Sequence, residues 1–173
     1  MSQSIEINLN PSEMLLASSV GCMRMVQNLK NGWRRTKGEE SGGPWEVHIE
    51  GAMGEMAVAK ALGRFWNGAV GDYSAADVGR FQIKTTRHLN GNLLLNRLDR
   101  DGKYILVRGS QGEYEVVGWV DSDDVKAKQW WNERTPADRS HWLYPASRMH
   151  PISTLRKEPM FHDQHTNGHL AKR

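Results

Sequence analysis

Asp77-Val-Gly-Arg-Phe-Gln-Ile-Lys84 is the stretch of sequence that decides the fold and the candidate chemistry of this chain. Apolar and polar residues alternate from Arg80 to Thr86, which predicts a β-strand with Gln82 and Lys84 as neighbours on one face. Asp77 precedes the strand, so a carboxylate, an amide and an amine are expected close together. These are the groups that metal-dependent cleavage of a phosphodiester would use.

The composition is that of an ordinary globular domain. The chain has 173 residues, of which 38% are hydrophobic and 25% are charged. We expect a single domain over residues 1–157, followed by an irregular or disordered tail over residues 158–173. The formal charge of +3 favours contact with a polyanion only weakly, because 23 basic residues are nearly offset by 20 acidic ones.

Cysteine usage and hydropathy indicate an intracellular protein. Cys22 is the only cysteine, so no disulfide can form within the chain. The first residues lack the basic start and apolar run of a secretory signal, and no apolar stretch approaches the length of a membrane span. These features predict a cytoplasmic protein without a membrane partner.

Periodicity and turn residues predict helices first and short strands afterwards. Helices are expected over about 12–29 and 50–65, with a loop over 33–44 between them. A third helix is expected to start at Asp121 and run to Trp131. The strands expected between the second and third helices form a meander, and they cover residues 69–73, 80–86, 92–95, 104–108 and 114–120.

Glu55 is expected to rise from an apolar stripe of the second helix. Ala52, Val58, Ala59 and Leu62 share its face at helical spacing. A charge held there costs several kcal/mol unless it is offset. A cation, a basic side chain or solvent must therefore meet the Glu55 carboxylate.

A divalent cation is one way to bring these acids together. Magnesium takes oxygen ligands and keeps several waters, so one or two carboxylates and a carbonyl suffice. Glu55, Asp77 and the backbone carbonyl of Ile83 could form such a set, with Gln82 assisting. Lys84 would orient the attacking water and stabilise the charge that grows on the phosphate. The alternative for Asp77 is a turn residue that caps its own backbone.

These residues resemble the PD-(D/E)XK nuclease superfamily, whose core is a helix bearing Glu followed by an Asp and then Glu or Gln, any residue, and Lys. The match here is Gly54-Glu55, Asp77 and Gln82-Ile83-Lys84-Thr85. The sequence most resembles small phage and bacterial members, and the likeness covers residues 12–155 through three further segments, Ala76–Gly79, Tyr104–Val107 and Val117–Val120.

The resemblance implies a restriction-endonuclease-like core of the α+β or α/β class, with a mixed central β-sheet flanked by helices. It also implies hydrolysis of phosphodiester bonds, in DNA, with Mg²⁺ or Mn²⁺ as the cofactor and Glu55, Asp77, Gln82 and Lys84 as the catalytic residues. A homodimer is a further possibility, since many such nucleases act on duplexes as dimers. If the chain is phage-encoded, its compartment would be the cytoplasm of the bacterial host.

A second group of residues suggests contact with nucleic acid outside this site. Trp33, Arg34, Arg35 and Lys37 combine a stacking surface with three cations, although Glu39 and Glu40 follow them and a solvated loop is the alternative. Two functions therefore stay open. One is a metal-dependent nuclease, and the other is a catalytically inactive nuclease-fold protein that acts as a nucleic-acid-binding or assembly module.

Overall fold

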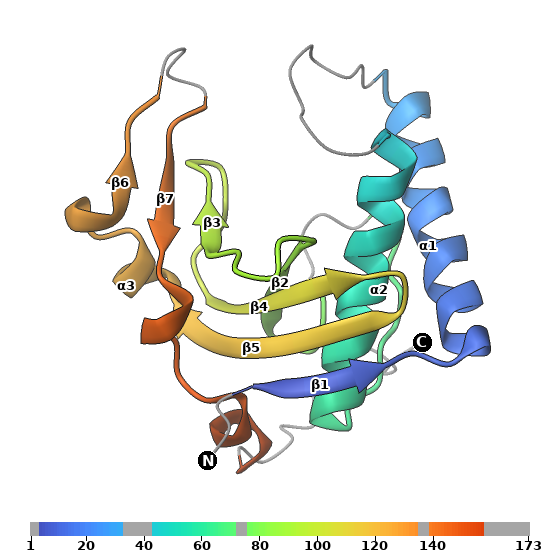
Figure 1. Ribbon diagram of the computed structural model, residues 1–173. Coiled ribbons are helices and arrows are strands. Elements are labelled where there is room, and N and C mark those ends of the chain that lie inside the picture. Colours follow the sequence, from blue (N-terminus) through green and yellow to red (C-terminus); the bar gives the residue numbers. More distant parts are fainter. Residues whose placement is uncertain (1–3, 33–42, 72–75, 135–138, 158–173) are drawn as a thin grey trace, which may run out of the picture.

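The computed structural model describes residues 4–32, 43–71, 76–134 and 139–157. Within these ranges, two long helices and two small β-sheets make up the fold (Figure 1). The elements in chain order are β1 (Ile5–Asn8), α1 (Pro11–Lys30), α2 (Pro44–Leu62), β2 (Phe81–Thr86), β3 (Leu93–Leu95), β4 (Lys103–Ser110), β5 (Glu113–Asp121), α3 (Ser122–Val125), η1 (Lys128–Trp130), β6 (Trp131–Asn132), β7 (His141–Tyr144), η3 (Ala146–Arg148) and η4 (Ile152–Lys157).

The central sheet is mixed, as expected, and the protein belongs to the α+β class. Its strand order is β1-β5-β4-β2, in which β5 pairs antiparallel with both β1 and β4, whereas β2 pairs parallel with β4. The expected meander is wrong, because β3 does not pair between β2 and β4. Instead β3 leaves for a second, antiparallel sheet of order β3-β7-β6. The detour through β3 supplies the crossover that a parallel pair needs.

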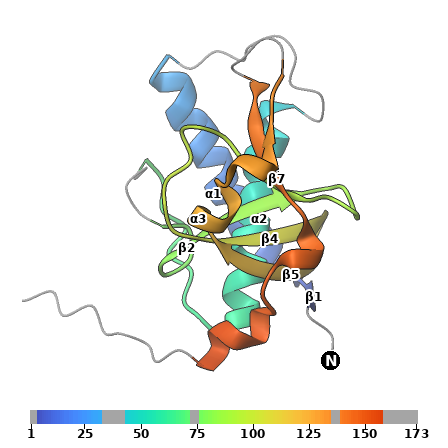
Figure 2. The same cartoon turned by 90° about the vertical axis from the view of Figure 1, so that its left-hand side faces the viewer.

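The two faces of the central sheet carry different layers. Along β4, Ile105 and Val107 join the core that contains α2, while Tyr104 and Leu106 join the core beneath the second sheet. Helix α2 packs on the first face and α1 packs on the outer side of α2 (Figures 1 and 2). The long helices therefore lie together on one face, and the second sheet covers part of the other.

Local chemistry explains where the long helices begin and how closely they pack. Asn10 and Glu13 form a reciprocal capping box at the start of α1. Gly63 ends α2 in the left-handed conformation, with φ of 63°. At the contact between the helices, a Cβ on Gly21 would lie 2.5 Å from the Ile49 Cα atom. The absence of that carbon lets the two helices approach each other closely.

Several expected boundaries differ from the structure. Helix α2 begins at Pro44, six residues earlier than expected, and no strand forms over residues 69–71; residues 72 and 73 of that expected strand lie outside the described part. The expected third helix is only α3, followed by the 3₁₀ turn η1. Strands β1, β6 and β7 were not expected; β1 and β7 have four residues each and β6 has two. In the described residues, no helix has the length and apolar character that crossing a membrane requires.

Candidate active site at the free edge of β2

Asp77 is held beside β2 by a tight turn. The Phe81 N–H donates to the Val78 carbonyl at 3.0 Å, and the Asp77 N–H donates back to the Phe81 carbonyl at 3.0 Å. Gly79 adopts φ of 60° inside this turn, a conformation that glycine reaches without a steric cost. Although few residues separate Asp77 from the strand, this turn brings its carboxylate back to the outer edge of β2, which has no neighbouring strand.

The Asp77 carboxylate is aimed at the backbone of Ile83. The Ile83 N–H donates to the Asp77 Oδ2 atom at 2.7 Å. In a β-strand the N–H and C=O of one residue point toward the same edge, as Phe81 shows two residues earlier by using both groups in the turn. The Ile83 carbonyl therefore faces the same free edge as the Asp77 carboxylate. The two groups are two of those that the sequence indicated as possible ligands of a divalent cation.

Glu55 reaches the same region from α2, and a basic side chain meets it. The Glu55 side chain is buried, with 6% of its surface exposed. Arg24 of α1 donates to both of its oxygens, at 2.5 and 2.8 Å, and the Trp66 Nε1–H donates to Oε2 at 2.9 Å. Arg24 also donates through Nε to the Ala69 carbonyl at 3.0 Å. Of the three sequence-based alternatives for Glu55, the basic side chain is the one that the structure contains.

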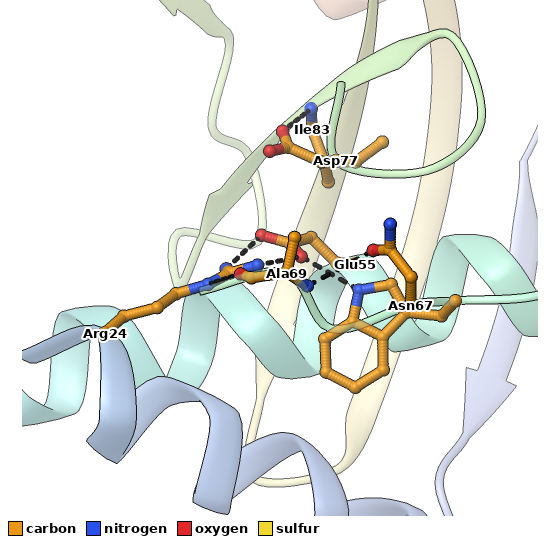
Figure 3. A network of polar contacts seen from close by, with 7 residues as sticks. Arg24, Glu55, Asn67, Ala69, Asp77 and Ile83 are labelled. Carbon is orange, nitrogen blue, oxygen red and sulfur yellow. Dashed lines mark hydrogen bonds and ion pairs between the residues drawn. The ribbon is translucent and has the colours of Figure 1, made fainter. Parts of the chain in front are cut away.

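Asp77 lies close enough to this ion pair for the charges to act on one another (Figure 3). Burial raises the pKa of Asp77 from 3.8 to about 6, and the negative charge of Glu55 adds to the rise. The hydrogen bond from Ile83 and the charges of Arg24 and Lys84 act in the opposite direction. Asp77 is thus a partly buried carboxylate whose negative charge is incompletely offset by its surroundings.

Lys84 approaches from the other side of Asp77 and is held by an acid that the sequence did not indicate. Its Nζ atom donates to Asp99 Oδ1 at 2.7 Å, in the loop between β3 and β4. The second Asp99 oxygen accepts from the Asn96 N–H at 2.7 Å, and Lys126 donates to the Asp99 carbonyl at 2.8 Å. Asp99 is therefore fixed on both sides and restricts where the Lys84 amine can lie.

A groove begins at Lys84 and continues along the face of the sheet that carries the second sheet. It has a volume of about 390 Å³, and its lining includes the polar residues Lys84, Thr86 and His88 and the apolar residues Leu94 and Leu143. Gln82 has the same orientation as Lys84 on β2, and its side chain makes no hydrogen bond to any described residue. The sequence-based expectation that Gln82 and Lys84 share a face is in keeping with this arrangement.

The donor atoms fit a single divalent cation held chiefly by Asp77 and the Ile83 carbonyl. Magnesium needs one or two carboxylates and otherwise keeps water, and a cation would stabilise the charged form of Asp77, whose pKa is raised first by burial and then by the charge of Glu55. Glu55 is the third donor, but Arg24 already occupies both of its oxygens. Among the described residues no cluster of three acidic, histidine or cysteine side chains is arranged to hold a metal. Glu55 can join the set only if Arg24 moves.

The structure thus places Glu55 and Lys84 within electrostatic range of Asp77, whose carboxylate accepts a hydrogen bond from Ile83, but Lys84 lies on the face of β2 turned away from α2. It also adds three residues that the sequence did not indicate. Arg24 and Asp99 each bind one member of the set, and Trp66 caps Glu55. Arg24 could have been recognised from the sequence as an inward-facing cation, because it shares a helix face with the buried residues Ala17, Val20, Gly21 and Met25. The proposed nucleic-acid contacts Trp33, Arg34, Arg35 and Lys37 lie outside the described residues.

Comparison with known proteins leaves the function to be argued from this site. The chain matches no protein-family model, no curated protein and no solved structure.

Proposed function

We propose that this protein is a divalent-cation-dependent nuclease that hydrolyses phosphodiester bonds in DNA. The observation that supports the proposal is that Asp77 lies at the unpaired edge of β2, bonded to the Ile83 N–H, within electrostatic range of Glu55 and Lys84. A helix, a turn and a strand contribute these groups from separate parts of the chain. Two acids and one lysine around an exposed backbone carbonyl are suited to charge stabilisation at a phosphate.

Asp77 and the Ile83 carbonyl would hold the Mg²⁺ or Mn²⁺ ion, and Glu55 would complete the set after Arg24 moves. When bound, the ion would lower the pKa of a water and offset charge on the phosphate. The Lys84 amine would orient the attacking water, because Asp99 fixes the amine beside Asp77. Gln82, on the same face of β2, is left to contact the water or the phosphate.

The groove next to Lys84 gives the substrate a place to lie. Its polar lining residues Thr86, His88 and Asn92 offer hydrogen bonds to phosphate or sugar, and its leucines offer an apolar surface to a base. The groove is open rather than enclosed, which suits a polymer that must enter and leave from the side. The chain's small positive charge adds little attraction, so binding is expected to weaken with salt only moderately.

A second candidate function is an inactive nuclease fold that binds nucleic acid or serves in assembly. One observation favours it specifically: both Glu55 oxygens are occupied by Arg24, and Lys84 is occupied by Asp99. A site whose charges are already paired gains less from a cation. In the enzyme these pairs must open or rearrange, whereas in a binding module they would remain as structural ion pairs.

Incubation with linear, circular and branched DNA, with Mg²⁺, Mn²⁺ or a chelator, separates the two functions. We expect metal-dependent cleavage that falls by about 100-fold or more in Lys84→Ala and in Asp77→Asn. Lys128→Ala is the matched control, because Lys128 is exposed and lies in η1, outside the site. Binding of DNA without cleavage under every metal would instead support the inactive module.

A further inference from the structure

The outer face of α1 is an apolar surface that the rest of the described chain leaves open. Five of its side chains are exposed: Leu15 by 71%, Leu16 by 55%, Met23 by 58%, Val26 by 41% and Leu29 by 41%. Helix α1 is the outermost element on its side of the molecule, with α2 between it and the sheet (Figure 1). The apolar periodicity that predicts this helix therefore belongs mainly to the face turned away from the core.

This face is continuous and carries almost no charge. At 3.6 residues per turn, the five exposed positions form one stripe with Ser19 and Cys22, roughly 21 Å long at 1.5 Å per residue. The only charged residue between Glu13 and Lys30 is Arg24, which points inward to Glu55. The largest apolar patch on a soluble monomer is often an interaction site, and this stripe is a patch of that kind.

We propose that this stripe is the interface with a second copy of the chain, with two α1 helices packed antiparallel about a two-fold axis near Cys22. An antiparallel pair centred between Cys22 and Met23 would place Leu16 against Leu29 of the partner subunit. The small Ser19 would lie against Val26 of the partner subunit, which lets the helices approach. No like charges meet in this arrangement, and the two helix dipoles oppose each other.

The size of the stripe sets the strength of the dimer. The five side chains expose roughly 450 Å² of apolar surface in each copy, within the range of the largest patches on monomers. Two copies would bury about 1,000 Å² or somewhat more once the rim is included, near the lower limit for specific interfaces. The dimer is therefore weak and concentration-dependent. The face is opposite to the Arg24 side of α1, so the dimer does not depend on the proposed nuclease activity.

Sedimentation of the full chain without nucleic acid tests the proposal over concentrations from about 1 to about 500 µM. We expect the average mass to rise from that of one chain toward that of two. Leu16→Glu and Met23→Glu should each keep the mass at one chain, because a charge within the stripe would be buried between the two helices. Leu98→Glu is the matched control, since Leu98 is 96% exposed and lies in the β3–β4 loop.

Cys22 provides an independent measurement on the same samples. It is the only cysteine and is partly exposed at the centre of the stripe, so a short bismaleimide should join two chains in the wild type and in Leu98→Glu. The cross-link should be lost in Leu16→Glu. The mass of one chain at every concentration would overturn the proposal, and so would a dimer that persists in both stripe variants.

Discussion

Replacing Asp77 by Asn should stabilise the protein above pH 6, because the variant removes a partly buried charge that the fold only partly offsets. The pKa of Asp77 is raised from 3.8 to about 6, mainly by burial and then by Glu55. At 1.36 kcal/mol for each pKa unit, the rise corresponds to about 3 kcal/mol of unfolding free energy. The Asn amide oxygen can still accept the hydrogen bond from Ile83, so the turn should persist.

The pH dependence follows from the direction of the shift. Between pH 3.8 and about 6 the folded state holds a proton on Asp77 that the unfolded state has released, so the unfolding free energy falls as the pH rises. This contribution is fully present below pH 3.8 and is lost above the folded pKa. The variant lacks the titration. Its advantage over the wild type should grow from near zero at pH 3.5 to as much as about 3 kcal/mol at pH 7.5.

Urea unfolding of both proteins at several pH values measures this difference. Asp123→Asn is the control, because Asp123 is exposed and should change stability little at any pH. Magnesium adds a second readout at pH 7.5: a concentration ten times the Kd should raise wild-type stability by about 1.4 kcal/mol and leave Asp77→Asn unchanged. An Asn variant that is no more stable than the wild type at pH 7.5, with an equal urea dependence, would refute the reasoning.

Two further predictions concern the packing and charge that position the site. Gly54→Ala should lower the unfolding free energy by about 2 kcal/mol, because the new Cβ would lie 2.0 Å from the buried Thr85 Oγ1 atom. Much of this loss should disappear when Thr85 is also replaced by Ala. If urea unfolding shows that the losses of the two single variants simply add, the contact is contradicted. Arg24→Gln should lower the unfolding free energy by about 3 kcal/mol, because it leaves Glu55 buried without a cation. In thermal or urea unfolding, Arg24→Lys should be more stable than Arg24→Gln but less stable than the wild type.

Elements that depend on local patterns could be predicted from the sequence. The alternation from Arg80 to Thr86 predicted β2, and capping and turn residues predicted α1 and the β4–β5 hairpin. The sequence also indicated that Glu55 needs a partner, since a charge on an apolar stripe is costly unless it is offset, and the structure supplies Arg24. These features rest on residues that are close in sequence or on a strong physical cost.

Long-range pairing decides the features that the sequence did not predict. The residues of β2 do not show whether it pairs with the next strand, β3, or runs parallel to β4, as it does in the structure. Periodicity identifies the apolar face of α1 but does not show whether that face is turned to the core or to the outside. In the structure α2 packs on the other face, where the small residues Ala17 and Gly21 lie. The partners Arg24 and Asp99 come from elements 31 and 15 residues away from the groups they bind.

Anomalous diffraction from crystals soaked in Mn²⁺ tests the central claim most directly. The account predicts one manganese peak bonded to the Asp77 carboxylate and the Ile83 carbonyl at the edge of β2, with Arg24 displaced from Glu55 when that acid joins the set. The peak should be absent in Asp77→Asn crystals treated in the same way. The metal site, and with it the proposed nuclease, would be contradicted if saturating Mn²⁺ gave no peak at this edge and Arg24 stayed bound to both Glu55 oxygens.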